Sequence, residues 1–387
     1  MSRGSHSSRN GPSITVFLRP YDDGHRRYSV YYYEGMRRYL ASTGGAYEPV
    51  SIGNHPDVIA ALCRFRNLYR LRPLFDRVPW LGSATDRLAS LIEGEPRLPG
   101  GVQTPRVLQF LAAQEGGQTL RVCVDPADDG GSLEHAALDW SDVYFKTNYW
   151  PTLVYPPKVR PLVNADGSVL PRLGALRQRR SARTQYDVCM VVRVWGGKDE
   201  VEGVEHNLRL IEAISRARCS KFLYAYLVAG DIRAAAKRLE SQGIPCGTAP
   251  LPPVKLWDVT AASRLNVIRL GMHYCIPWRV TGALAIGSAI VLDRAPLSRW
   301  PEPLTPGVHY VDLGVETGKE QPLAPDRQYA AIPGKIEAWL ADTGLSTRLA
   351  KNSADYFDHH AAPERVGEYL VKTVSRIAAN GEAQHVG

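Results

Sequence analysis

The stretch that decides the fold runs from Gly271 to Arg294 and reads GMHYCIPWRVTGALAIGSAIVLDR. Pro277 suits the first position of a helix, because the N–H that proline lacks would have no partner there, and Gly287 suits a left-handed helix end. The wholly apolar run 289–292 that follows predicts a strand. A short helix that leads into such a strand is typical of a buried parallel sheet, in which helix starts and connecting loops carry the polar groups.

Arg279 stands at the start of this otherwise nearly uncharged helix. The first turn of a helix has free N–H groups and a partial positive charge, and a guanidinium beside them suits a phosphate group. The other interpretation is an ordinary buried helix whose arginine pairs with a carboxylate of the same protein. The segment alone does not decide between the two.

Apolar strands and amphipathic helices alternate on both sides of this stretch. The alternation predicts an α/β fold with two doubly wound, Rossmann-like domains that face each other across a cleft. The segment 57–111 is predicted to be mainly helical, and a C-terminal helix is predicted from about Pro363. The predicted divisions are a disordered N-terminus (1–13), a first α/β domain (14–165), a linker (166–184), a second α/β domain (185–350) and a C-terminal helix with its tail (351–387).

Composition predicts a soluble protein with an anionic partner. The 387 residues carry a formal charge of +8, which favours a nucleotide, a phosphate, a lipid head group or a nucleic acid as that partner. The longest largely apolar run, 280–292, is too short to span a bilayer, and the first residues lack the apolar stretch of a signal peptide. The six cysteines form no CxxC pair and no zinc-site spacing with histidine, so we expect reduced core residues in a cytoplasmic protein.

Four residues of the second domain are candidates for binding a phosphorylated ligand. Arg193 ends the domain's first strand and, with Arg279, could contact a diphosphate; the alternative for Arg193 is a solvated strand end. His273 and Tyr274 lie in the loop before the helix and could stack on a base or bind a sugar hydroxyl, or be structural. The usual nucleotide signatures are missing, because Lys198 in RVWGGKDE is followed by Asp and no GxGxxG follows a strand.

Three segments resemble the donor half of GT-B glycosyltransferases: SRLNVIRLGMHYCIPWRVTGALAIGSAIVLD, RWPEPLTPGVHYVDL and YFDHHAAPERVGEYLVKTV. They are most similar to the capsule-associated, lipopolysaccharide-modifying family that includes the protein O-glucosyltransferases, and more loosely similar to exostosin-like enzymes. The resemblance covers about 185–375. Its features, in order, are a glycine-rich turn, a helix arginine, a Gly-Ser pair, a Trp-Pro segment and a His-Tyr-Val strand: Gly271, Arg279, Gly287-Ser288, Trp300-Pro301 and His309-Tyr310-Val311. The serine that the family places two residues before the arginine is Pro277 here, which leaves the phosphate contact to Arg279 and backbone amides.

The resemblance implies a GT-B fold in which residues 185–350 bind a nucleotide-diphosphate sugar and residues 14–165 face the acceptor. It implies transfer of a hexosyl or pentosyl group to a hydroxyl of a glycan, a lipid-linked sugar or a small molecule, with the donor as substrate and no cofactor. No Asp-x-Asp motif occurs, and Asp258 and Asp293 are the only acidic residues between Ser241 and Pro301. Lacking that metal-binding motif and the paired glutamates of many retaining enzymes, the chain is expected to carry out inverting, metal-independent transfer without a bound metal.

Such a transfer needs a base that deprotonates the acceptor hydroxyl. The base candidates in the first domain are Asp23 and His25, in the loop after the first strand, and Asp125, at the end of the strand TLRVCVD. Asp22 and Lys146 are further candidates for the cleft, although an exposed strand lysine is an equal interpretation of Lys146. Turn formation and helix capping are the competing roles of the acidic residues.

Two other functions remain open. The arginine-rich stretch from Arg172 to Arg183 would suit a nucleic acid, but no recognised binding motif accompanies it, so we expect no nucleic-acid partner. A catalytically inactive nucleotide-sugar sensor would have the same fold. In the segment 57–82, Arg64, Arg66 and Arg70 flank an apolar stripe, which indicates either an ordinary surface helix or a peripheral contact with an anionic membrane.

Overall fold

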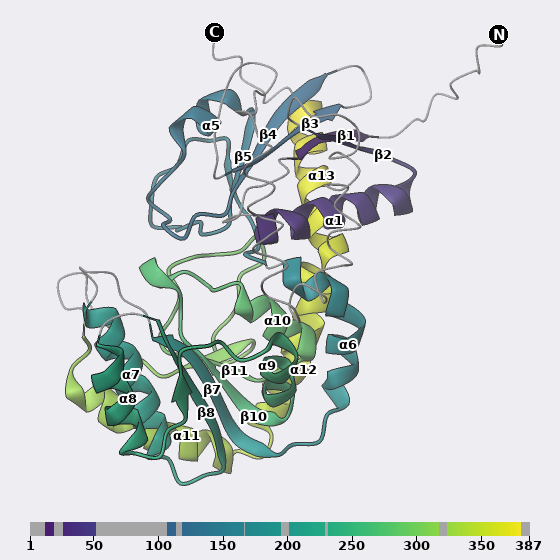
Figure 1. Ribbon diagram of the computed structural model, residues 1–387. Coiled ribbons are helices and arrows are strands. Elements are labelled where there is room, and N and C mark those ends of the chain that lie inside the picture. The colour runs from purple at the N-terminus through teal and green to yellow at the C-terminus, as the bar shows by residue number, and fades with distance from the viewer. Residues whose placement is uncertain are drawn as a thin grey trace, which may run out of the picture. The chain divides into compact units, whose positions relative to one another are not determined.

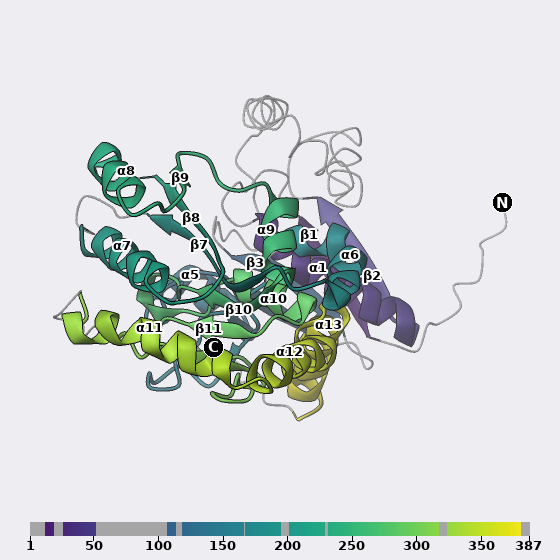
Figure 2. The ribbon, with the colours of Figure 1, turned by 90° about the horizontal axis from the view of Figure 1, so that it is seen from below.

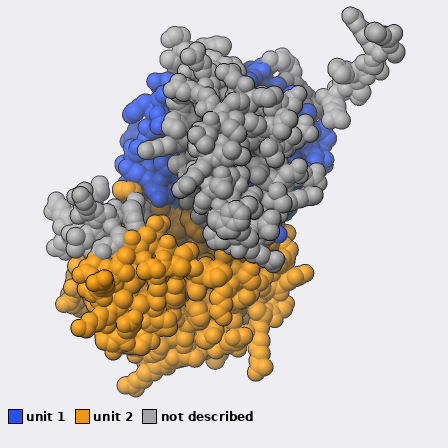
Figure 3. Space-filling model, viewed as in Figure 1, with its two compact units in different colours: residues 1–171, 298–301, 360–387 blue, residues 172–297, 302–359 orange. Residues whose placement is uncertain are grey.

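The computed structural model describes residues 12–18, 26–51, 107–113, 118–165, 167–194, 201–228, 231–316 and 323–380. The chain divides into two compact units, which Figure 3 colours separately. Unit 1 consists of Met1–Pro171, Ser298–Pro301 and His360–Gly387, and unit 2 of Arg172–Leu297 and Glu302–His359. The first passage from one unit to the other therefore falls within the segment 166–184, which the sequence suggested as a linker.

Unit 1 contains a mixed sheet in the order β2-β1-β3-β4-β5-β6. Its strands are β1 (Ser13–Leu18), β2 (Ala46–Ser51), β3 (Leu108–Ala113), β4 (Thr119–Asp125), β5 (Val143–Lys146) and β6 (Val159–Pro161). β3 runs antiparallel to both of its neighbours, and the other pairs are parallel. The prediction of helix up to Leu111 was wrong at its end, because a short apolar run has no period that separates strand from helix. The remainder of that segment, 57–106, lies outside the described residues.

The helices described in unit 1 are α1 (Arg26–Thr43), α5 (His135–Trp140) and α13 (Pro363–Ala379). α1 and α13 pack together (Figure 1) and approach most closely at two glycines. A Cβ on Gly35 would lie 2.2 Å from the carbonyl oxygen of Pro363, and one on Gly367 would lie 2.1 Å from the backbone of Gly35. Any larger residue would force the helices apart. The predicted C-terminal helix is confirmed, and four residues of its expected apolar face are buried: Val366, Leu370, Val374 and Ile377.

Unit 2 contains a parallel sheet in the order β12-β11-β10-β7-β8-β9. Its strands are β7 (Tyr186–Val194), β8 (Lys221–Leu227), β9 (Cys246–Gly247), β10 (Ser263–Ile268), β11 (Ile290–Leu292) and β12 (Tyr310–Asp312). Numbered from β7 and read from the β9 edge, this is the strand order 3-2-1-4-5-6 of doubly wound nucleotide-binding folds. The order reverses between β7 and β10. The doubly wound sheet predicted for this part of the chain is therefore confirmed.

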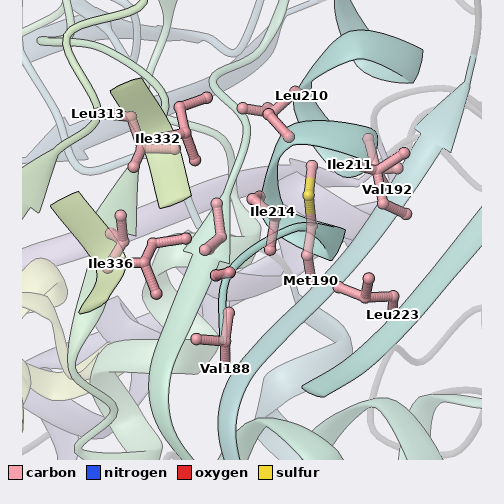
Figure 4. Close-up of a cluster of buried hydrophobic side chains, with 14 of the residues drawn as sticks. Val188, Met190, Val192, Leu210, Ile211, Ile214, Leu223, Leu313, Ile332 and Ile336 are labelled. Atoms are coloured by element: carbon pink, nitrogen blue, oxygen red, sulfur yellow. The ribbon is translucent and has the colours of Figure 1, made fainter. Parts of the chain in front are cut away.

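Helices cover both faces of the unit 2 sheet (Figure 2). One face carries α7 (Val201–Ser215), α8 (Ile232–Glu240) and α11 (Asp326–Ala341), and the other carries α9 (Pro253–Ala261), α10 (Arg279–Ile286) and α12 (Leu345–Tyr356). Val188, Met190 and Val192 of β7 point into a core shared with α7 and α11 (Figure 4). Because side chains alternate along a strand, Cys189 and Val191 face the α10 layer. No helix in the described ranges is long and apolar enough to cross a membrane.

The segment 166–184, which was expected to be a linker, is helical from Gly167 to Ser181. It forms the 3-10 helix η1 (Gly167–Arg172), α6 (Leu173–Gln178) and a second 3-10 helix, η2 (Arg179–Ser181). Arg177 and Arg180 donate to Asp358 at 2.9 and 2.6 Å, and Arg179 donates to Asp258 at 2.7 Å. Three of the arginines that suggested a nucleic-acid surface are thus paired with carboxylates of unit 2, which lie far away in the sequence.

Candidate functional site

The candidate site lies at the edge of the unit 2 sheet where the strand order reverses. Ligands of doubly wound sheets bind outside the carboxyl ends of the strands at this point. Arg193 is the last residue but one of β7, the 3-10 helix η3 (Met272–Tyr274) follows β10, and α10 begins at Arg279. All four ligand-binding candidates of the sequence therefore belong to the ends of β7 and β10 or to the chain that follows β10.

Arg279 directs its guanidinium onto β7. Its Nη1 donates to the carbonyl oxygen of Val191, whereas Nε and Nη2 are buried without a hydrogen-bond partner. Burial lowers the pKa of the guanidinium, and the neighbouring Cys189 thiol opposes that shift. None of the hydrogen bonds or ion pairs among the described residues joins Arg279 to a carboxylate. The alternative interpretation, in which this arginine pairs with a carboxylate of the same protein, is therefore not supported by the described residues. Two buried nitrogens of the Arg279 guanidinium therefore have no hydrogen-bond partner.

Local sequence sets the start and the end of α10. Val280 N donates to the carbonyl of Pro277 at 2.9 Å, so the proline opens the first turn although regular helix begins at Arg279. Gly287 has φ 69° and ψ 48°, the left-handed stop that the sequence predicts. Gly282 allows α9 to pack closely, because a Cβ there would lie 2.3 Å from the Trp257 ring. This packing holds α10 against α9.

Arg193 lies at the same edge. It is exposed, and the alternation along β7 puts it on the same face as Cys189 and Val191, the residues beside the Arg279 guanidinium. The buried Asn207 of α7 donates to the carbonyl oxygen of Arg193 at 3.4 Å, and Oδ1 of Asn207 has no partner. The two arginines expected to meet a diphosphate therefore share one face of the sheet.

His273 and Tyr274 adopt left-handed backbone conformations, with φ of 57° and 58°. His273 is exposed. The ring of Tyr274 lies under the guanidinium of Arg294, whose Cζ is 4.8 Å from the ring centroid. One face of this ring is thus covered by an arginine of the protein, so the suggestion that Tyr274 stacks on a base can apply only to its other face.

A buried polar network, which the local sequence pattern does not predict, lies beside this turn. Asp293 directly follows β11. Its carboxylate accepts a hydrogen bond from Nε of Arg294 at 3.0 Å and another from the backbone N–H of Leu270 at 2.8 Å. His206 of α7 lies 3.1 Å from Asp293 Oδ2 through Nε2 and 2.7 Å from the Tyr329 hydroxyl through Nδ1. Burial, with help from Arg294, lowers the pKa of His206, while His206 and Arg294 outweigh burial and lower the pKa of Asp293. The network therefore holds a carboxylate, a guanidinium and a neutral imidazole.

In unit 1, Asp125 and Lys146 are register partners at the carboxyl ends of β4 and β5. They are 2% and 0% exposed, and Lys146 Nζ lies 2.8 Å from Asp125 Oδ2. The same carboxylate accepts the Tyr144 hydroxyl at 2.7 Å and the backbone N–H of Ala127 at 2.8 Å. Lys146 is therefore a buried counter-ion, which corrects its interpretation as an exposed strand lysine. Three donors occupy Asp125, so the geometry adds no support to its base role, which stays a prediction.

The other base candidates, Asp22, Asp23 and His25, lie outside the described residues, as do Arg64, Arg66 and Arg70 of the expected membrane-facing helix. Within the described ranges, no three or more His, Cys, Asp or Glu side chains are grouped so that they could hold a metal ion. The expected independence of metal stays a prediction.

No protein-family model matches the chain, and no curated protein matches it. Among solved structures it is similar to a glycosyltransferase from Rickettsia africae ESF-5, with 9% identity over 96% of this chain and 100% of that chain and a TM-score of 0.47. It is also similar to Anabaena HepE in complex with UDP and glucose, with 10% identity, 93% and 98% coverage and a TM-score of 0.46. The C-terminal domain of the group 1 glycosyl transferase LpcC from Francisella tularensis shares 13% identity over 48% of this chain and 91% of that domain, with a TM-score of 0.32. Such identities and TM-scores identify neither a family nor a substrate.

Proposed function

We propose that the chain is a glycosyltransferase that moves a sugar from a nucleotide-diphosphate sugar to an acceptor hydroxyl. The observation that carries the proposal is the buried guanidinium of Arg279, which has two unpartnered nitrogens and no carboxylate partner among the described residues. It belongs to the first residue of α10, at the edge where a doubly wound sheet binds its ligand. A buried charge without a counter-ion is costly, and an incoming anion relieves that cost.

A diphosphate fits these groups better than a single carboxylate does. The guanidinium offers Nε and Nη2 to one phosphate, and the amino end of α10 adds partial positive charge to the same anion. Arg193, on the same face of the sheet, suits a second phosphate. The resemblance of residues 185–375 to the donor half of GT-B enzymes supports a nucleotide sugar as the molecule that carries this diphosphate.

The proposed reaction is a direct displacement. The acceptor oxygen attacks the anomeric carbon, the bond from that carbon to the diphosphate oxygen breaks, and the nucleoside diphosphate leaves with the electron pair while a base takes the acceptor proton. Arg279 stabilises the negative charge that grows on the leaving group, which is the largest electrostatic demand of the step. Inversion and independence of metal belong to this proposal and rest on the missing Asp-x-Asp motif and the missing glutamate pair.

The test begins with binding of nucleoside diphosphates. Uridine, guanosine, adenosine and cytidine diphosphates are each titrated into the purified chain by calorimetry, with a thermal-shift screen in parallel. A ligand at about 100 times its dissociation constant should stabilise the protein by roughly 2.7 kcal/mol. Turnover of the matching sugar nucleotides is then measured on acceptor panels. A protein that binds none of the four diphosphates does not have the proposed donor site.

A catalytically inactive nucleotide-sugar sensor is the second candidate, because the carrying observation concerns binding alone. Diphosphate binding without hydrolysis or transfer of any sugar nucleotide would favour it. The nucleic-acid alternative is weakened, since Arg177, Arg179 and Arg180 are already paired within unit 2.

A further inference from the structure

The turn that follows β10 contains the only non-glycine residues with positive φ in the described part of the chain, His273 and Tyr274. A left-handed conformation costs free energy for residues with a Cβ, and two in succession cost more. A glycine at either position would remove its share of the cost. Such strain persists only where neighbouring groups hold the backbone in place.

Two backbone hydrogen bonds close this turn. Leu297 N donates to the carbonyl of Tyr274 at 3.0 Å, and Gly271 N donates to the carbonyl of Cys275 at 3.0 Å. A Cβ on Gly271 would lie 2.3 Å from the Cys275 sulfur, so the turn closes tightly around that position. The third contact is made by the Tyr274 ring, which packs against the Arg294 guanidinium at 4.8 Å.

Besides Tyr274, the Arg294 guanidinium contacts Asp293 and His206. It is 7% exposed, its Nε donates to Asp293 Oδ2 at 3.0 Å, and its Nη2 lies 2.9 Å from His206 Nε2. Asp293 Oδ1 also accepts the backbone N–H of Leu270, between the end of β10 and the strained turn. One carboxylate thus fixes both the start of the turn and the arginine that covers its tyrosine.

The hydrogen bonds around Asp293 continue to the helices α7 and α11. His206 belongs to α7, and its Nδ1 lies 2.7 Å from the hydroxyl of Tyr329 in α11. The charged groups that face His206 are Arg294 and Asp293, and the charge of Arg269 lowers the pKa of both His206 and Asp293. The guanidinium of Arg209 lies 5.9 Å from the centroid of the Tyr329 ring. The strained turn is therefore tied to two helices of the opposite sheet face.

We propose that Arg294, supported by Asp293 and His206, is a positioning residue that holds the strained turn so that His273 contacts a hydroxyl of the sugar-nucleotide donor. The inference rests on the proposed function. His273 is the exposed member of the turn, and Arg279, the proposed diphosphate ligand, follows six residues later in the same loop and helix. The strain is retained because the relaxed turn would move the imidazole away from the donor.

The first test substitutes His273 with glycine. This change relieves the left-handed strain and removes an exposed side chain, so the free protein should unfold at an equal or higher denaturant concentration. Donor affinity should nevertheless fall at least tenfold, which is about 1.4 kcal/mol. His273→Asn, which tolerates the left-handed region, separates the backbone from the imidazole: it should keep the stability of the parent and lose affinity as the glycine variant does. A merely structural turn would instead gain stability and keep its affinity.

The second test removes the aromatic face beneath Arg294. Tyr274→Leu should raise the KM for the sugar nucleotide at least tenfold with a smaller change in kcat, and Tyr274→Phe, which keeps the ring, should recover most of the loss. Tyr224→Leu, at a strand tyrosine of β8 that bonds to Ala249 O, is the matched control and should leave the donor KM unchanged.

Both tests measure binding by calorimetry, with the sugar nucleotide whose nucleoside diphosphate binds the parent protein, and turnover by steady-state kinetics. Parent-like donor binding by His273→Gly and by Tyr274→Leu overturns this inference, while the proposed function stands if Arg279→Met weakens diphosphate binding at least a hundredfold. Absence of diphosphate binding by the parent protein overturns the proposed function and this inference together.

Discussion

Replacing Arg279 with methionine should change the stability of the free protein and its ligand affinity in opposite directions. Methionine fills a similar volume in the layer between α10 and β7 but carries no charge. The arginine has two buried nitrogens without partners, and an unsatisfied buried polar group costs about 1–3 kcal/mol, more when charged. The hydrogen bond to the Val191 carbonyl is lost in exchange. We therefore expect the free variant to gain about 1 kcal/mol or more, which would raise its melting temperature by about 2–4 °C per kcal/mol.

The affinity of the Arg279→Met variant for a diphosphate should fall. Two charge-assisted hydrogen bonds to a diphosphate contribute about 1.5–3 kcal/mol each. Their loss should weaken diphosphate binding by about 3 kcal/mol or more, which is at least a hundredfold. In turnover, loss of a leaving-group contact should lower the rate by about 10²- to 10³-fold.

Urea unfolding, calorimetry and donor turnover measure the three quantities on one preparation. Arg348→Met is the matched control, because Arg348 forms an ion pair with Asp342 at 3.0 Å while 62% of its side chain is exposed. An exposed pair of this kind contributes about 0–1 kcal/mol, and the control should bind diphosphate as the parent does. Destabilisation of Arg279→Met by about 3–5 kcal/mol would refute the reasoning, since that is the signature of a broken buried ion pair.

Three further predictions concern other groups. Stability should fall as the pH decreases below about 6.5, because the unfolded chain then protonates His206 while burial keeps the folded imidazole neutral; His206→Gln should flatten that part of the urea-midpoint profile against pH. Lys146→Met should cost about 3–5 kcal/mol in urea unfolding by leaving Asp125 buried and unpaired, and adding Asp125→Asn to it should recover part of the loss; additive costs would speak against the pair. Donor turnover should change little when a chelator is added, and strict dependence on magnesium or manganese contradicts the metal-independent mechanism.

Local pattern was sufficient to predict the elements around Arg279. The left-handed stop at Gly287, the buried strand after it and the apolar face of α13 each depend on residues within one or two helical turns. The parallel sheet followed from the same logic, because uninterrupted apolar strands separated by amphipathic helices have few other arrangements. The strand β3 was missed, since its six residues LQFLAA carry no alternation.

Pairings over long sequence separations could not be predicted in this way. Asp125 and Lys146 stand opposite each other only because β4 and β5 are parallel and in that register, which the residue types do not specify. From the sequence alone, the arginines of the stretch 172–183 resemble a solvated basic surface. In the structure, Asp358 of the π-helical turn Phe357–Ala361, which follows α12, forms ion pairs with Arg177 and Arg180. His206 gave no local signal either, because its partner Asp293 lies on a strand end 87 residues away.

Four arginines lie at one edge of the unit 2 sheet. Arg193, Arg269, Arg279 and Arg294 all lie at or just beyond the carboxyl ends of strands in unit 2 or at the start of the helix that follows β10. Asp293 accepts hydrogen bonds from Arg294 Nε and from the Leu270 N–H, and its Oδ2 lies 3.1 Å from His206 Nε2. None of the hydrogen bonds among the described residues joins Arg279 to Asp293, and Nε and Nη2 of Arg279 have no hydrogen-bond partner. We therefore expect this arrangement to bind an anion with at least two charges along the face that Arg193 and Arg279 share.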